Sequence, residues 1–506
     1  MKIVISAILS LFVTVPLLAQ NKSAKRGIGW DEKTQKMSGL PISKMAPGVS
    51  WVYNWGIKPG NDLSGTGPQG MMDFVPMCWN GNFDEAGLRR WLTDNPGVRY
   101  LLGFNEPNFS AQANMTPAQA AAAWPRVEKI AADYGLKLVA PALNFTGERV
   151  GGRTWSPYEW LDEFLRIYPG ARFDCLALHC YMNWFGSTTW FATEYFYADL
   201  YNPAKKDVYG RYPNIVKYLD AYKEANGHFP RMMLTEFCSW ENDGTITGVD
   251  FQIDQMTQKV QKLEQSDLVE GYAWFMANGR AASYPYFSIF ETNRSDSELS
   301  ILGTVYTYMS SFDTSKYYAP GEQIAAKDYI DASTDGQQVC LRPNTESDSE
   351  QPLQVEMRSG TWTKYQINVP EAGEYKFTLR VKSSVDAPVW FYLDGKKSVT
   401  STLPATTGIW AYREFSATLS AGNHSIMLYN AGNMPFFING FSFTSTSSGI
   451  SSPEVDGADT ADGLVDVFDA GGMFVGTTRN LSALNLPSGI YVIVTHSGEK
   501  KKTVIK

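Results

Sequence analysis

Two carboxyl groups stand where apolar segments of this chain end. The run "YLLGF" at 100–104 has the length of a buried strand and is followed, without a spacer, by an Asn-Glu-Pro tripeptide that contains Glu106. A second run, "RMMLTEF" at 231–237, ends in the same way with Glu236. Two carboxyl groups held together can divide a reaction, because one can stay protonated as an acid while the other stays ionised. Either glutamate alone could instead cap a helix or form a surface ion pair.

The sequence lacks the residue patterns that several other kinds of catalysis require. Of four histidines, just His179 and His228 precede residue 320, so neither a three-histidine nor an HExxH metal site can form in that part of the chain. The sequence contains no GxSxG, Walker or dinucleotide-binding glycine pattern. The net charge is −8 and the only basic run is 500–502, which argues against nucleic acid as a partner. Carboxylate chemistry remains.

The five cysteines include no CxxC pair, so they predict neither a zinc ribbon nor a thioredoxin-type motif. A chain of 506 residues does not need disulfides for stability, and we expect buried free thiols. We assign no metal and no cofactor.

The elements that must position the two glutamates alternate along the first 315 residues. A helix is clearest at 116–135, where Thr116 can cap it, Pro117 suits its first turn and Gly135 can end it. Further helical stretches begin near 158, 214 and 251, and eight strand-like segments begin near 26, 49, 72, 99, 136, 173, 231 and 270. This alternation predicts an α/β fold, a (β/α)₈ TIM barrel over 26–318. Active sites of that fold lie at the carboxyl ends of strands, so Glu106 on strand four and Glu236 on strand seven would share one mouth.

An Asn-Glu pair on strand four and a glutamate on strand seven resemble the large retaining clan of (β/α)₈ glycosidases. The finer pattern looks like family 128 of the glycoside hydrolases, endo-β-1,3-glucanases, and covers about residues 26–315. Its motifs recur in order on most strands: "WVYNWG" (51–56), "FVPMCW" (74–79), "LLGFNEPN" (101–108), "LALHCYMNW" (176–184), "LTEFCSW" (234–240) and "GYAWFM" (271–276).

The resemblance implies a role for each residue of the pair. Glu106 would be the acid/base and Glu236 the nucleophile of a double displacement, with the carboxyl groups about 5–5.5 Å apart. Asn105 would bind the sugar 2-hydroxyl, although an Asn before Glu-Pro could also simply form a turn. His179 and Tyr181 alternate along strand six and share one face, where they would hold Glu236 and the sugar; a hydrogen-bonded core pair is the alternative.

Aromatic residues crowd the predicted strand ends. Sugar rings present apolar C–H faces that stack on Trp and Tyr, so a cleft lined with such rings would hold a glycan chain. Core packing is the alternative for each ring. The candidate substrate contacts are Tyr53, Trp55, Trp79, Trp184 and Trp274.

Residues 322–446 change to short strands with period-two alternation, which predicts an all-β jelly-roll sandwich. The segment resembles carbohydrate-binding modules of families 6 and 35, which implies that an exposed Trp410 and Asn439 hold sugar. We expect Trp362 in the sandwich core, and the scaffold also occurs as a spacer without ligand. The matching stretches are "GTWTKYQINVPEAGEYKFTLRV" (360–381), "TGIWAYREF" (407–415) and "FFINGFSF" (436–443).

The two ends of the chain indicate export. Residues 1–20 have the basic start, apolar stretch and small-residue boundary of a secretory signal peptide, and no other segment is long enough to span a membrane. Residues 447–463 form a Ser-, Gly- and Asp-rich linker. Residues 464–506 form a small β domain that resembles the C-terminal sorting domain of type IX secretion. We therefore expect a secreted or cell-surface protein.

The sequence thus predicts a secreted, endo-acting glycoside hydrolase that cleaves laminarin-like β-1,3-glucan with retention. The expected partners are a β-glucan and the type IX secretion machinery, and we expect a monomer. Two alternatives stay open: a hydrolase of another β-glycan, and a non-catalytic surface glycan-binding protein. The presence of both Glu106 and Glu236 argues against the second, because binding alone needs no carboxylate pair.

Overall fold

The computed structural model describes residues 20–32, 41–181, 211–239, 248–279, 286–291, 298–334, 337–345, 351–446, 465–469, 474–478, 489–495 and 500–505. The chain divides into two compact units, Met1–Thr444 and Ser445–Lys506. The expected signal peptide, apart from its last residue, and the expected linker lie outside the described residues.

Eight parallel strands form the barrel, in the order β3-β2-β1-β10-β9-β8-β5-β4. The two outermost strands of this order are joined by a parallel bridge between Met77 and Leu102, with the Cys78 amide 2.9 Å from the Leu102 carbonyl oxygen, so the sheet closes. The predicted (β/α)₈ fold is confirmed. The strands are β1 (Arg26–Gly29), β2 (Trp51–Tyr53), β3 (Asp73–Phe74), β4 (Tyr100–Leu102), β5 (Lys137–Val139), β8 (Cys175–Cys180), β9 (Arg231–Phe237) and β10 (Val269–Trp274).

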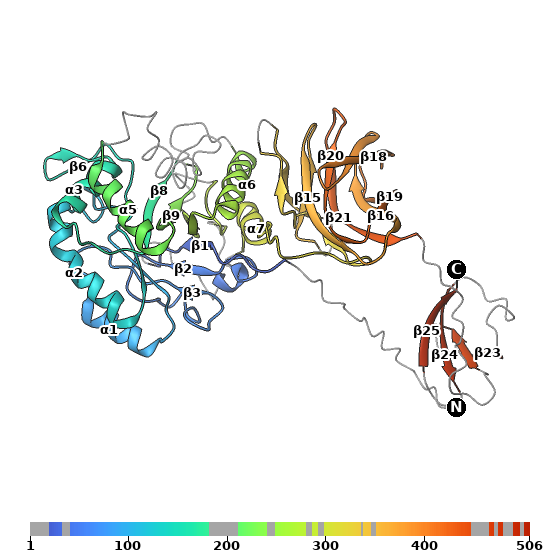
Figure 1. Cartoon of the computed structure of the whole chain (residues 1–506), viewed down its shortest axis with the longest axis horizontal. Helices are drawn as coiled ribbons and strands as arrows, with labels where there is room; N and C mark the ends of the chain where they lie inside the picture. Colours follow the sequence, from blue (N-terminus) through green and yellow to red (C-terminus); the bar gives the residue numbers. More distant parts are fainter. Residues whose placement is uncertain are drawn as a thin grey trace. The chain divides into compact units, whose positions relative to one another are not determined.

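Helices cover the outside of these strands (Figure 1). Helix α2 begins as predicted, with a capping box between Thr116 and Gln119, and ends at Gly135, whose φ of 65° is the left-handed conformation that glycine favours. Its buried Trp124 packs edge-on against Phe104, 5.3 Å between ring centroids. The helices are α1 (Glu85–Asp94), α2 (Pro117–Tyr134), α3 (Pro157–Ile167), α5 (Pro213–Asn226), α6 (Val249–Gln265) and α7 (Ile301–Tyr308); a 3₁₀ turn spans Pro41–Met45 and a small hairpin pairs β6 (Arg149–Val150) with β7 (Arg153–Thr154).

The predicted sandwich consists of two antiparallel sheets whose inward side chains form its core. Phe377 lies 4.9 Å from Phe391 and 5.2 Å from Phe415, centroid to centroid. One sheet has the order β13 (Cys340–Pro343), β14 (Leu353–Met357), β21 (Phe436–Ser445), β16 (Gly373–Lys382) and β19 (Ala411–Leu419), with β11 (Ile324–Ala325) beside β21; the other has the order β12 (Asp331–Ala332), β15 (Trp362–Val369), β20 (Gly422–Asn430), β17 (Ala387–Leu393) and β18 (Lys396–Leu403).

One expectation for this sandwich is wrong. Trp362 is only partly buried, because the alternation of β15 gives the core positions to Thr363 and Tyr365, both 0% exposed. Trp362 therefore faces away from the core.

The unit at 445–506 contains a four-stranded antiparallel sheet, in which the expected final strands β24 and β25 pair with each other. All five cysteines are buried thiols, as expected. Within the described part of the chain, no helix has the length and hydropathy needed to cross a membrane. The strands of this sheet are β22 (Val465–Asp469), β23 (Phe474–Thr478), β24 (Gly489–Thr495) and β25 (Lys500–Ile505).

A buried arginine on the first strand of the barrel bonds to its last strand and its last two helices. The guanidinium of Arg26, on β1, is 1% exposed and donates to the Tyr272 hydroxyl (3.0 Å) and to the carbonyls of Tyr306 (3.1 Å) and Met309 (3.2 Å). It also lies 3.4 Å from the Glu264 carboxylate. These bonds join β1 to β10 and to the helices α6 and α7.

We predict that Arg26→Ala destabilises the barrel by about 3–5 kcal/mol, since it leaves the Glu264 carboxylate buried without its partner. Urea unfolding of the full chain measures this. Arg99→Ala is the matched control, because Arg99 is 55% exposed in its pair with Asp73 and should cost at most about 1 kcal/mol. Equal effects of the two substitutions would contradict the account.

Candidate active site

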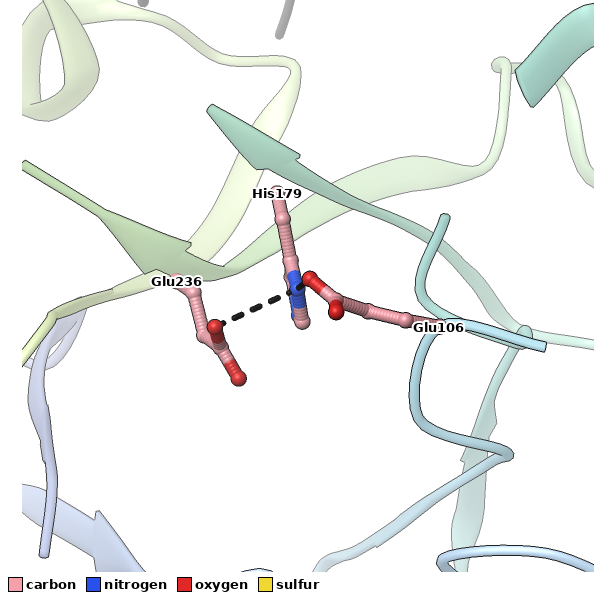
Figure 2. Close-up of side chains that lie close together, drawn as sticks. All are labelled: Glu106, His179 and Glu236. Carbon is pink, nitrogen blue, oxygen red and sulfur yellow. Dashed lines mark hydrogen bonds and ion pairs between the residues drawn. The ribbon is translucent and has the colours of Figure 1, made fainter. Parts of the chain in front are cut away.

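Glu106 and Glu236 meet at the mouth of the barrel with His179 between them (Figure 2). The His179 Nδ1 atom lies 2.6 Å from Glu106 Oε1 and 3.3 Å from Glu236 Oε2. One oxygen of each carboxyl and a nitrogen of His179 all lie within 4.8 Å of one another. So close an approach is compatible with the roughly 5–5.5 Å separation of the two carboxyl groups in retaining glycosidases.

A β-bulge turns Glu236 into the mouth. Leu178 pairs with Leu234, but His179 pairs with Glu236, so β9 has one extra residue, Thr235, at this point. Because side chains alternate along a strand, an inserted residue shifts which of them face the interior. The Thr235 hydroxyl lies 3.0 Å from His179 Nε2 and helps to fix the imidazole.

A left-handed backbone conformation positions Glu106. The residue has a φ of +47° and lies four residues beyond the end of β4, where its amide donates to the Ala142 carbonyl at 2.8 Å. This conformation is costly for a residue with a side chain and persists only where the surroundings enforce it. Here it turns the carboxyl toward His179.

Three donors hold the Glu236 carboxylate. The Trp55 indole N–H donates to Oε1 at 2.7 Å, the Tyr53 hydroxyl to the same oxygen at 3.3 Å, and the Tyr181 hydroxyl to Oε2. Burial raises the pKa of Glu236 and the charge of Glu106 adds to the effect, while His179, Tyr181 and Trp55 act against it without cancelling it. The donors therefore favour the ionised form that a nucleophile requires.

Glu106 is held by a residue that sequence reasoning missed. The Asn144 side-chain amide donates to Glu106 Oε1 at 2.6 Å, the same oxygen that His179 contacts. The fully buried Asn108 fixes the backbone of Asn144 in turn. The Asn108 Oδ1 accepts from the Asn144 backbone N–H (3.1 Å), and the Asn108 Nδ2 donates to the Asn144 backbone carbonyl (2.7 Å). In the part of the chain that the structure describes, no donor bonds Oε2, which leaves that oxygen to exchange a proton. The signal in the sequence was an Asn directly after the fifth apolar run.

The two carboxyl groups favour the charged form of His179. Burial lowers the pKa of His179, but the charges of Glu236 and Glu106 and the bond to Glu106 outweigh it and raise that pKa above its ordinary value. The three residues are also placed so that they could hold a metal ion. A protonated imidazole has no lone pair for a metal, so protonation of His179 would oppose metal binding at this group.

The other residues that were predicted to contact the substrate differ in how accessible they are. Asn105 is 2% exposed; its Nδ2 donates to Gln112, and its Oδ1 has no partner among the described residues, so it can accept from a bound hydroxyl. Trp55 and Trp79 are half-buried at the mouth. Tyr53 is 0% exposed, so it holds Glu236 by its hydroxyl and offers no ring face to a sugar, contrary to the expectation of a substrate contact.

The expectation for Trp274 is wrong. Its side chain is fully buried outside the barrel, where the indole N–H donates to the Phe287 carbonyl at 2.8 Å and the ring packs against Phe237. The next residue, Phe275, contacts the rings of Trp55 and Tyr181 instead. Trp184, the other expected contact, lies outside the described residues.

The sandwich residues are also less open than expected. The half-buried ring of Trp410 is covered by Arg380 and Lys382, which lie 4.8 and 5.0 Å from its centroid, because both side chains point outward from the neighbouring strand β16. Asn439 lies on β21 and is 4% exposed. The expectation of an exposed Trp410 is therefore wrong, because the ring is half-buried and two cations lie over it.

Comparison with known proteins agrees with this geometry. Residues 27–306 match the glycosyl hydrolase catalytic core family, and residues 334–445 match the carbohydrate binding module (family 6). The chain is 32% identical to a GH128 (subgroup II) endo-beta-1,3-glucanase from Pseudomonas viridiflava, covering 57% of this chain and 98% of that one, with a TM-score of 0.43. The corresponding enzyme from Sorangium cellulosum is 30% identical, with coverages of 56% and 97% and a TM-score of 0.41.

A curated relative matches over a shorter part of its length. Alkali-sensitive linkage protein 1 of Schizosaccharomyces pombe is 26% identical over 260 residues, which are 50% of this chain and 39% of that protein. The chain thus spans about two fifths of the length of this relative.

A (β/α)₈ barrel with a carboxylate pair at its mouth, followed by a carbohydrate-binding module, defines a glycoside hydrolase. The chain belongs to the glycosyl hydrolase catalytic core family and is of the GH128 type.

We predict that His179 titrates above its ordinary pKa of about 6.5 and that Glu106→Gln lowers this pKa, because one of the two facing charges is removed. A raised pKa means that the interaction stabilises the fold below pH about 6.5 and that this contribution is lost as the pH rises through the raised value. Histidine-selective NMR can follow the signals of the four histidines.

His424 is the internal control, since its pKa is also raised, by the bond to Asp394, and should not respond to Glu106→Gln. A pKa of His179 at or below 6.5 would contradict the conclusion that Glu106 and Glu236 favour its charged form.

Proposed function

We propose that this protein is an endo-acting β-1,3-glucanase that works with retention, with Glu106 as acid/base and Glu236 as nucleophile. The observation that carries the proposal is the close approach of the two carboxyl groups, within 4.8 Å, at the carboxyl ends of β4 and β9. The two relatives with at least 30% identity are described as endo-beta-1,3-glucanases, which supports the substrate and the mode of action.

The mechanism begins with cleavage of the glycosidic bond. Glu106, protonated on Oε2, gives its proton to the glycosidic oxygen as a carboxylate oxygen of Glu236 attacks the anomeric carbon from the opposite face. The bond from carbon to leaving oxygen breaks and a glycosyl ester of Glu236 forms. Water then attacks the ester while Glu106 accepts its proton, which releases the sugar and restores both carboxyl groups.

The surrounding residues support each step. His179 and Asn144 fix Glu106 through Oε1, so the other oxygen faces the reaction. Trp55 and Tyr181 orient the nucleophile and stabilise it again when it leaves the ester. The unpaired Oδ1 of Asn105 can accept the 2-hydroxyl of the sugar beside the reaction centre.

Two alternatives are weaker. Hydrolysis of another β-glycan would use the same carboxylates, and the pair by itself does not distinguish linkages. A non-catalytic glycan-binding role leaves unexplained why both carboxylates are buried and held by donors from several strands, since burying such charges is costly.

We further propose that the protein is exported, first by its signal peptide and then by a type IX sorting domain at 464–506, and that it acts in the medium or at the cell surface as a monomer. A polymeric glucan is too large to reach an enzyme inside the cell, which supports this location. The sandwich, which matches a carbohydrate-binding module, would raise the local concentration of polymer at the barrel.

We predict that Glu106→Gln lowers kcat/KM on laminarin by about 10²–10⁴-fold and that Glu236→Gln lowers it at least as much. The native enzyme should release mixed oligosaccharides early, as internal cleavage requires. Reducing-end assays with product sizing over time measure both effects.

The matched control is Glu163→Gln, which alters an exposed pair with Arg166 on helix α3 and should keep the rate within about twofold. Hydrolysis that survives Glu236→Gln would overturn the assignment of the nucleophile. A native enzyme that leaves β-1,3-glucan intact but cleaves another β-glycan would overturn the substrate.

A further inference from the structure

Helix α6 has two opposite polar faces. Positions 254, 258, 261 and 265 recur every three or four residues and so share one side of the helix. Positions 252 and 259 are two turns apart and lie about half a turn from the first set. All of these side chains are polar, and four of them, Gln252, Gln258, Lys259 and Gln261, are buried.

The first face binds the sandwich. The Gln258 side chain donates to the Thr334 carbonyl at 2.7 Å, and the Gln261 side chain donates to the Ala332 carbonyl at 2.9 Å. The carboxylate of Asp254, 14% exposed, pairs with two sandwich arginines, Arg342 at 3.2 Å and Arg358 at 3.4 Å. These bonds join α6 to the end of β12 in one sheet and to β13 and the end of β14 in the other, so the sandwich is docked on the helix and not only connected through the chain.

The opposite face binds the segment directly after Glu236. The Gln252 side chain donates to the Ser239 carbonyl at 3.0 Å and accepts from the Ser239 backbone N–H at 3.3 Å. It thus bonds both backbone groups of Ser239, as the backbone of a neighbouring strand would. Lys259, fully buried, donates to the Ser239 hydroxyl at 2.9 Å. Ser239 itself is 0% exposed and lies three residues beyond Glu236. Helix α6 therefore fixes where β9 leaves the barrel.

We propose that the sandwich is a positioning element for the nucleophile: by holding α6 through Asp254, it sets the position of Ser239 and thereby of Glu236. The expected effect of the sandwich on catalysis rests on the proposed role of Glu236 as nucleophile. The link from the sandwich through α6 to Ser239 does not depend on that role. The sandwich then has a second function besides contact with polymer, and Gln252 and Lys259 are positioning residues that act through Ser239.

The experiment uses the full chain with three variants. Arg342→Ala/Arg358→Ala removes the ion pairs on the sandwich face, Gln252→Met removes the bonds to Ser239, and the third variant combines them. Arg413→Ala is the matched control, since Arg413 is a sandwich arginine that bonds to Pro404 and Ala405 and not to α6. Where Gln252→Met does not fold, Ser239→Ala tests the same face through its other contact, because it removes the hydroxyl that Lys259 bonds.

Two readouts separate this inference from the proposed function. Hydrogen–deuterium exchange at residues 237–239 should rise in the arginine double variant, as in Gln252→Met, and stay at the native rate in Arg413→Ala. On soluble laminaritriose, kcat should fall about tenfold with KM within about twofold, because a slightly displaced nucleophile slows chemistry more than binding. The combined variant should be no slower than the slower of the two, since both act through one helix.

Native exchange at 237–239 in the arginine double variant would overturn the inference, as would effects on kcat that multiply in the combined variant. If the native protein cleaves no β-1,3-glucan, the proposed function fails. The exchange result then still decides whether the sandwich holds this segment.

Discussion

The site depends on one imidazole, that of His179, which both carboxyl groups share. Glu106 and Glu236 are 3% and 4% exposed, and two ionised carboxylates this close and this dry repel each other strongly. The imidazole of His179 lies between them, and its protonation offsets that repulsion, while donors that follow β2, β5 and β8 bond the carboxyl oxygens. Because these donors come from strands far apart in sequence, the pair can exist only where the barrel is closed.

Two local departures from regular structure complete the arrangement. The bulge at Thr235 re-aims Glu236, and the left-handed φ of Glu106 turns its carboxyl back toward His179. Both cost backbone energy that a regular strand would not, and both occur at the catalytic carboxylates. The barrel supplies the stability that permits them, through contacts such as those of Arg26 below the site.

The correct predictions of the fold and of the carboxylate pair came from local features of the sequence. The eight strands follow from apolar runs, α2 from Thr116, Pro117 and Gly135, and the carboxylate pair from its place at strand ends. The errors came from information that is not local. A register shift between Tyr272 and Trp274 decides that Trp274 packs outside and Phe275 reaches the mouth. The cations over Trp410 come from β16, about thirty residues earlier, and Asn144 meets Glu106 across 38 residues of chain. Helix α1 was not predicted, although its N-cap Asp84 is a local signal.

The most direct test of the account is to trap the glycosyl–enzyme. A laminaribiosyl fluoride that carries fluorine at C2 forms the ester quickly and releases it slowly, so the labelled residue can be found by peptide mass spectrometry. The account predicts one sugar per chain, attached to Glu236, with release of the β anomer when the ester turns over. A label on another carboxylate, or first-formed product of the α anomer without any adduct, would contradict it.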